Sequence, residues 1–237
     1  MNSKILILSL SLLALSGCNS SGSKKVVPES NIIREDIEWL DVWLPHSNEH
    51  DLPHILLIGN SITRDYYPKV ETQLNNKAYV GRLSTSKSIG DPALLSEVAL
   101  ILSYDNYEII HFNNGMHGWG YTEDEYEKCF PDLIRTIKEH APDAKLIWAS
   151  TTPVRMGDGM AEFDPKTERV RVRNQIAEKE VKNHDIIIND LFGFVEHHPE
   201  YYAGGDGTHL VAEGVTAMSE QVASVILKVL EEEKSKK

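Results

Sequence analysis

The feature of the sequence that most constrains the fold is the alternation of short apolar runs with longer amphipathic segments. Short apolar runs predict buried strands, and hydrophobic residues at helical spacing between them predict helices. We expect strands at 55–58, 79–83, 107–112, 144–149 and 186–188. We expect helices at 62–74, 92–102, 123–140, 167–182 and 211–230. Strands joined by helices form parallel sheets with helices on both faces, so the sequence predicts an α/β fold, a three-layer α/β/α sandwich around a central, mostly parallel five-stranded sheet.

Size and charge narrow the class of protein. The chain has 237 residues with 41% hydrophobic content, enough for one sizeable core in a single domain. Its formal net charge is -12. Nucleic-acid binding needs basic patches that neutralise phosphates, so this acidity disfavours nucleic acid as a partner.

The N-terminal residues have the pattern of an export signal followed by a linker. The apolar run at 5–15 is too short to span a membrane, and Leu15-Ser16-Gly17-Cys18 resembles the lipobox of bacterial lipoproteins. We therefore expect a lipoprotein signal peptide at 1–17, lipid on Cys18, a flexible tether at 18–30 and the folded domain at 31–237. The alternative is ordinary secretory cleavage that leaves Cys18 unmodified. The expected location is the bacterial cell envelope, where the lipid would anchor the protein at the periplasmic side or at the cell surface.

Ser61 is a candidate nucleophile because it follows a predicted strand and opens a predicted helix. Unpaired backbone N–H groups and the positive end of the helix dipole would stabilise an oxyanion at that point. Serine is also a favoured helix cap, so a purely structural role stays open. The surrounding residues do not form the G-x-S-x-G elbow of α/β-hydrolases, because position 63 is threonine.

Asp206 and His209 stand three residues apart on a glycine-containing turn before the last predicted helix. A hydrogen bond from His209 Nδ1 to the carboxylate would leave Nε2 free to accept a serine proton. The alternative is an Asx-turn at Asp206 beside an incidental surface histidine. Together with Ser61, the pair would supply a nucleophile, a base and an orienting acid, which favours a serine hydrolase.

Four short blocks in this order resemble those of the SGNH, or GDSL-like, hydrolases, from about Ile55 to the C-terminus. They are Gly59-Asn60-Ser61, Gly90, Asn113-Asn114-Gly115 and Asp206-x-x-His209. The resemblance implies an SGNH hydrolase-like, flavodoxin-like sandwich. It implies Ser61 as nucleophile, His209 as general base and Asp206 as its orienting acid. It also implies an oxyanion hole formed by the N–H groups of Ser61 and Gly90 and the amide of Asn114.

The blocks depart from the family pattern at two places. Asn60 replaces the usual aspartate before the serine, and an amide can make similar turn hydrogen bonds. The third block usually has the pattern Gly-x-Asn-Asp, whereas this chain has Phe112-Asn113-Asn114-Gly115. Alignment of the blocks favours Asn114 as the oxyanion donor, with Asn113 as the competing neighbour.

The resemblance implies a serine esterase that removes acetyl or other short acyl groups from carbohydrates, without a cofactor or metal. Its partner would be a small-molecule or polysaccharide ester. Two alternatives are a lysophospholipase or thioesterase acting on longer acyl chains, and a glycan-binding lipoprotein without turnover. The oligomeric state stays open.

Several other polar and aromatic residues have two interpretations. His46, His50 and His54 have helical spacing that would suit a metal, but Pro45 and Pro53 argue against a helix there, so we expect no metal site. Trp119 and Tyr121 would form either a sugar-stacking wall or core packing. The segment at 156–163 is either a lid or a mobile surface loop, and Cys129 is expected to be a small buried hydrophobe rather than a nucleophile.

Overall fold

The central sheet of the computed structural model, which describes residues 32–235, contains six strands. In sheet order they are β1 (Leu40–Trp43), β3 (Tyr79–Thr85), β2 (His54–Gly59), β4 (Tyr107–Phe112), β5 (Lys145–Ala149) and β8 (Ile187–Asn189). The five strands from β3 to β8 pair in parallel, as predicted. The expected signal peptide (1–17), Cys18 and the tether (18–30) lie outside the described residues.

The sixth strand, β1, lies before the first strand expected from the sequence. β1 pairs antiparallel with β3, with Leu40 opposite Thr85 and Trp43 opposite Arg82. Without β1, β3 would be the edge strand of the sheet and would leave a row of backbone N–H and C=O groups unpaired. β1 forms hydrogen bonds with these groups. The expected five-stranded sheet is therefore extended by one antiparallel edge strand.

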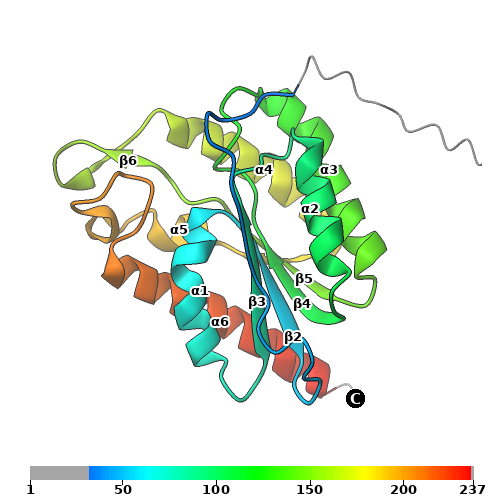
Figure 1. Ribbon diagram of the computed structural model, residues 1–237. Coiled ribbons are helices and arrows are strands. Elements are labelled where there is room, and N and C mark those ends of the chain that lie inside the picture. Colours follow the sequence, from blue (N-terminus) through cyan, green and yellow to red (C-terminus); the bar gives the residue numbers. More distant parts are fainter. Residues whose placement is uncertain (1–31, 236–237) are drawn as a thin grey trace, which may run out of the picture. The chain divides into compact units, whose positions relative to one another are not determined.

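Helices cover both faces of the sheet, so the predicted three-layer sandwich is confirmed (Figure 1). One face carries α1 (Ser61–Gln73) and α6 (Ala212–Lys234), and the other carries α2 (Pro92–Leu102), α3 (Glu123–His140) and α4 (Lys166–Asn183). Among the described residues, no helix is long and apolar enough to cross a membrane. The bounds of α2 and α3 are those expected from the sequence.

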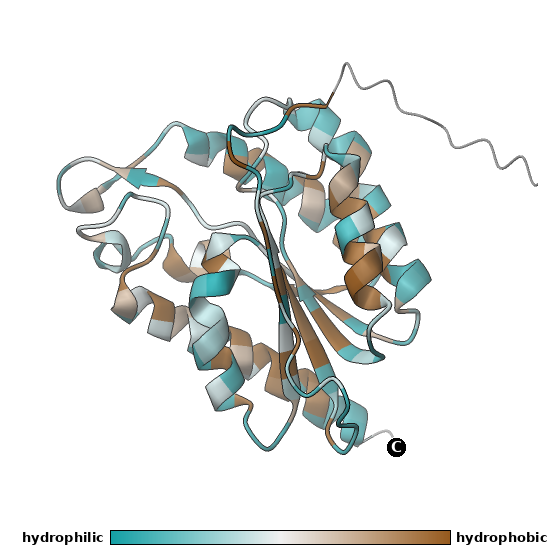
Figure 2. Cartoon of the chain, viewed as in Figure 1, coloured by the Kyte–Doolittle hydropathy of each residue, from teal (hydrophilic) through white to brown (hydrophobic). Residues whose placement is uncertain are grey.

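The central strands β2 and β4 are largely apolar on both faces because each face is covered by helices (Figure 2). In β2, Ile55 and Leu57 pack in the cluster with α1 and α6, whereas Leu56 and Ile58 pack in the cluster with α2 and α3. Successive side chains of a strand point to opposite faces, which explains why this run is continuously hydrophobic.

Several short elements of the described chain were not predicted from the sequence. They are α5 (Leu191–Val195), the 3-10 helices η2 (Asp158–Met160) and η3 (Pro199–Tyr202), and the hairpin of β6 (Arg155–Met156) with β7 (Glu162–Phe163). The hairpin lies in the segment that we expected to be a lid or a mobile loop. These elements are only two to five residues long, too short for a periodic sequence pattern.

Candidate active site

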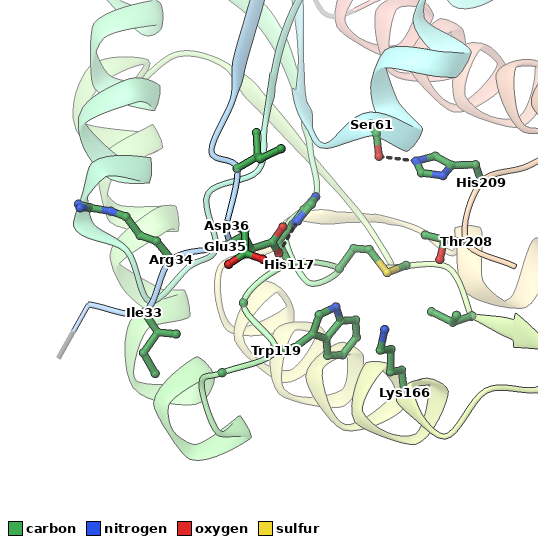
Figure 3. A pocket seen from close by; sticks show the side chains of 15 residues that line it. Ile33, Arg34, Glu35, Asp36, Ser61, His117, Trp119, Lys166, Thr208 and His209 are labelled. Atoms are coloured by element: carbon green, nitrogen blue, oxygen red, sulfur yellow. Dashed lines mark hydrogen bonds and ion pairs between the residues drawn. The ribbon is translucent and has the colours of Figure 1, made fainter. Parts of the chain in front are cut away.

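Ser61 is the first residue of α1, and only Asn60 separates it from the carboxyl end of β2. Asn60 caps the helix, because its side-chain oxygen accepts a hydrogen bond of 2.9 Å from the N–H of Ile62. The interpretation of Ser61 as the helix cap is therefore wrong, and its hydroxyl is available for another contact. That contact is to His209, whose Nε2 lies 2.7 Å from Ser61 Oγ (Figure 3).

The turn at 206–209 holds the imidazole through two oxygens of one carboxylate. Asp206 Oδ2 lies 2.7 Å from His209 Nδ1, and Oδ1 accepts the backbone N–H groups of Thr208 and His209 at 2.9 and 2.8 Å. The Asx-turn and the histidine contact, which we treated as alternatives, therefore occur together. A carboxylate can only accept, so Nδ1 carries the proton and the lone pair of Nε2 faces the Ser61 hydroxyl.

The charge of Asp206 is stabilised by these same contacts. Partial burial acts to raise its pKa, but hydrogen bonds from His209 and Thr208 outweigh burial and lower the pKa of Asp206 to about 2. The carboxylate is therefore ionised at any pH at which the imidazole can act as a base.

A glycine allows this turn to approach the first residue of the β6–β7 hairpin closely. Gly207 has a φ of +78°, a backbone conformation that side chains disfavour. Its carbonyl accepts a hydrogen bond of 2.8 Å from the N–H of Arg155, and a Cβ at Gly207 would lie only 2.0 Å from the Arg155 carbonyl oxygen. The start of β6 therefore supports the turn that carries Asp206 and His209.

The two asparagines of the third block make different hydrogen bonds. Asn113 Nδ2 donates to the carbonyl of Ala149 and to Thr151 Oγ1, which uses both amide hydrogens. Asn114 Nδ2 donates to the carbonyl of Lys87, and one amide hydrogen has no acceptor among the described residues. This count favours Asn114 over Asn113 as a donor to a substrate.

Asn114 also lies against the loop that carries Gly90, because its Oδ1 accepts the N–H of Ile89 at 3.0 Å. The N–H groups of Ser61 and Gly90 donate to no acceptor among residues 32–235. A Cβ at Gly90 would lie 2.7 Å from the ring of Tyr121, so only glycine fits there without a shift. The oxyanion hole stays a prediction, for which these unpaired donors are available.

Ser61 and His209 open into a cleft of about 630 Å³ (Figure 3). The other lining residues are Ile33, Arg34, Glu35, Asp36, Ile37, Met116, His117, Gly118, Trp119, Gly120, Val154, Lys166 and Thr208. Trp119 therefore faces the cleft, whereas Tyr121 is 6% exposed and packs in the interior. None of the residues at 156–163 lines this cleft.

The segment at 33–37 forms one wall of the cleft, which the sequence did not predict. The N–H of Ile33 donates to Tyr121 Oη at 2.7 Å, and Glu35 lies 2.8 Å from the ring of His117. No motif marks these residues, because their position depends on the pairing of the following strand β1 with β3.

The adjoining wall, at 115–121, is fixed by arginines of α4. Arg173 is 1% exposed and donates to the carbonyl oxygens of Gly115, His117 and Gly118 at 2.9 to 3.0 Å. Glu123 lies 3.2 Å from the same guanidinium. Guanidinium donors form a rigid fork, so a single buried side chain fixes three carbonyls of this wall. The sequence predicted the helix at 167–182 but not the contacts that Arg173 makes.

Cys129 packs against the core cluster of α2 and α3, and burial raises the pKa of its thiol. A thiol with a raised pKa is a poor nucleophile. His46, His50 and His54 do not lie on a helix in the described structure.

No protein-family model matches the chain, and no curated protein is significantly similar to it in sequence. Solved structures are similar. A putative GDSL-like lipase from Parabacteroides merdae is 21% identical, with a TM-score of 0.57 over 71% of this chain and 93% of that one. A carbohydrate esterase of family 3 from Talaromyces cellulolyticus is 14% identical, with a TM-score of 0.60 over 76% and 99%. The catalytic domain of peptidoglycan O-acetyltransferase A from Streptococcus pneumoniae is 16% identical, with a TM-score of 0.54 over 76% and 96%.

At 14 to 21% identity, these likenesses show a shared fold. The chain therefore has the fold of the SGNH, or GDSL-like, hydrolases, as the resemblance of its sequence blocks implied.

Proposed function

We propose that this protein is a serine ester hydrolase that removes acetyl or other short acyl groups from carbohydrates. The observation that carries the proposal is the continuous relay of two 2.7 Å contacts from Asp206 through His209 to Ser61. This relay opens into a cleft large enough for a small ester or one residue of a polysaccharide.

In the proposed reaction, Ser61 Oγ attacks the ester carbonyl while its proton moves to His209 Nε2. The resulting imidazolium is stabilised by the ionised Asp206. Nε2–H then protonates the leaving alcohol oxygen as the C–O bond breaks, which leaves an acyl group on Ser61. Water attacks the acyl carbon, gives its proton to Nε2 and releases the carboxylic acid. No cofactor or metal takes part in these steps.

The negative charge of the tetrahedral intermediate needs donors that are in place before the reaction. The N–H groups of Ser61 and Gly90 and the remaining amide hydrogen of Asn114 are neutral donors on fixed backbone or on a hydrogen-bonded side chain. One such donor typically contributes about 3 to 4 kcal/mol to transition-state stabilisation.

The preference for a carbohydrate ester rests on the lining of the cleft and on two of the similar structures. Glu35, Asp36 and Lys166 place charged groups around the cleft, and these suit hydroxyl-rich substrates better than a long acyl chain. Trp119 presents an aromatic ring on which a sugar can stack. Similar folds belong to proteins named as a carbohydrate esterase and a peptidoglycan O-acetyltransferase.

The proposed location is the bacterial cell envelope, with a membrane anchor through lipid on Cys18. The support is the sequence at 1–30, in which an apolar run and a lipobox-like tetrapeptide precede a polar linker. Metabolic labelling with a fatty-acid probe would test it: label is expected on the wild type and not on Cys18→Ser.

The activity is tested with p-nitrophenyl acetate and purified protein. Ser61→Ala should abolish hydrolysis, whereas Ser96→Ala, at an exposed serine of α2, should leave the rate unchanged. A fluorophosphonate probe should label the wild type and Ser96→Ala only. Equal rates in wild type and Ser61→Ala would refute the catalytic assignment, and absence of labelling would favour a glycan-binding protein without turnover.

The substrate class needs a second assay. Acetate release from a panel of acetylated polysaccharides is expected to exceed release from p-nitrophenyl esters of long fatty acids. A strong preference for long acyl chains would instead support the lysophospholipase or thioesterase alternative.

A further inference from the structure

A second cluster of chemically active side chains lies at the other end of β2 from Ser61. His54 is the first residue of β2, whereas Ser61 follows its last residue, so the two are separated by roughly 20 Å of extended chain. His50, His54 and Asp105 each offer one ligand atom, and these atoms all lie within 4.8 Å of one another. We propose that this cluster binds a divalent transition-metal ion, with zinc as the best fit.

The polar contacts of the two ring nitrogens of His54 carry the proposal. Its Nδ1 lies 2.9 Å from Asp105 Oδ2, and its Nε2 lies 2.7 Å from the carbonyl oxygen of Glu49. Both partners are acceptors, and a neutral imidazole has only one N–H. The ring nitrogen that faces Asp105 therefore needs either a second proton or a metal ion.

A metal ion at Nδ1 satisfies every group around the ring. Nε2–H donates to the Glu49 carbonyl, and metal-binding histidines usually donate their second N–H to a backbone carbonyl or a carboxylate in this way. Asp105 Oδ2 then becomes a ligand of the same ion. The side chains of His54 and Asp105 are 9% and 12% exposed, so neither is a freely moving surface group.

His50 supplies the third ligand from the solvent side. Its ring centroid lies 5.9 Å from that of His54, and the ring makes no hydrogen bond to another described residue. Two imidazole nitrogens and one carboxylate oxygen favour zinc or a similar ion over calcium or magnesium, which prefer oxygen ligands only. Solvent can provide the fourth ligand because His50 is exposed.

The site differs from the helical arrangement of His46, His50 and His54 considered from the sequence. His46 pairs with Glu49 at 2.9 Å and stacks on Tyr79, so it is engaged elsewhere. Asp105 takes its place, because the pairing of His54 with Tyr107 brings the start of β4 beside the start of β2. A bound ion would join the segment before β2 to the turn before β4 and stabilise the folded state, independently of the proposed ester hydrolysis.

The test is titration of chelator-treated protein with zinc chloride, followed by calorimetry and thermal unfolding. We expect one equivalent of zinc to bind, and Tm to rise by roughly 5 to 10 °C when free zinc exceeds Kd about 100-fold. His50→Ala and Asp105→Asn should each weaken binding at least about tenfold. His50 is exposed, so the metal-free Tm of His50→Ala should match that of the wild type.

Two control variants separate this site from other histidines. His198→Ala removes a half-buried histidine that pairs with Glu200, and His209→Ala removes the imidazole beside Ser61. Both should retain zinc binding. The proposal is overturned if no saturable binding occurs, if His50→Ala and Asp105→Asn bind as tightly as the wild type, or if binding is lost in His209→Ala. The cluster would then be only a polar contact of His54 with Asp105.

Discussion

Replacement of Gly207 by alanine tests whether the turn that carries Asp206 and His209 depends on its close approach to Arg155. Gly204, three residues earlier, provides a matched control. Both glycines have a φ of +78°, but a Cβ at Gly204 would meet nothing within 4 Å, whereas at Gly207 it would lie 2.0 Å from the Arg155 carbonyl oxygen. Gly204→Ala and Gly207→Ala therefore impose the same strain of a positive φ on alanine, but only Gly207→Ala adds a steric clash with Arg155.

The strain and the clash have different expected magnitudes. An alanine in the left-handed region costs about 1 to 2 kcal/mol, which is the whole effect expected for Gly204→Ala. In Gly207→Ala the clash adds about 1 to 3 kcal/mol, and loss of the bond from the Arg155 N–H adds about 1 kcal/mol. The decrease in Tm should therefore be at least about twice as large for Gly207→Ala as for Gly204→Ala.

The effect on catalysis should differ more sharply. Relief of the clash requires the alanine Cβ and the Arg155 oxygen to separate by about 1 Å, and a displacement of that size in a catalytic group can lower the rate about 100-fold. We expect kcat/KM for p-nitrophenyl acetate, measured well below Tm, to fall by about this factor in Gly207→Ala and to stay near the wild-type value in Gly204→Ala. Equal losses of Tm and unchanged kcat/KM in both variants would refute the argument.

Three further predictions follow from the site. Hydrogen bonds lower the pKa of Asp206 from 3.8 to about 2, so the stability that its carboxylate contributes should be complete above about pH 4 and disappear as the pH falls to 2. The difference in unfolding free energy between wild type and Asp206→Asn, measured by urea unfolding, should therefore shrink over this range. A difference that stays constant with pH would contradict the prediction. Arg173→Met removes the donors that fix the cleft wall at 115–121, so kcat/KM should fall at least about tenfold. Arg135→Met, on the exposed side of α3, should leave kcat/KM unchanged. Equal values of kcat/KM in the two variants would show that the wall does not need the guanidinium. Asn114→Ala should lower kcat about 100- to 1,000-fold, because its second amide hydrogen is available to the oxyanion. Asn113→Ala should lower Tm but leave kcat within about tenfold of the wild type, because both of its amide hydrogens are used within the protein. The reverse pattern of kcat would make Asn113 the oxyanion donor.

The sequence was sufficient for the parallel part of the sheet and for the helices that cover it. Runs such as Ile55–Ile58 and the apolar face of 123–140 are local patterns, so they predict a strand or a helix without knowledge of their neighbours. The order of these elements places Ser61, Gly90 and Asn114 after the carboxyl ends of neighbouring parallel strands. The sequence also placed Asp206 and His209 on one turn, because they are only three residues apart.

The edge strand β1, the walls of the cleft and the choice of oxyanion donor depend on contacts between segments that are distant in the sequence. β1 is a strand only because the edge of β3 offers unpaired backbone groups, and the cleft wall at 33–37 depends on that pairing. The choice between Asn113 and Asn114 depends on which carbonyls surround each amide, and the wall held by Arg173 depends on where α4 packs. Hydrogen-bond partners and close approaches of this kind are set by three-dimensional neighbours, and a one-dimensional pattern does not contain them.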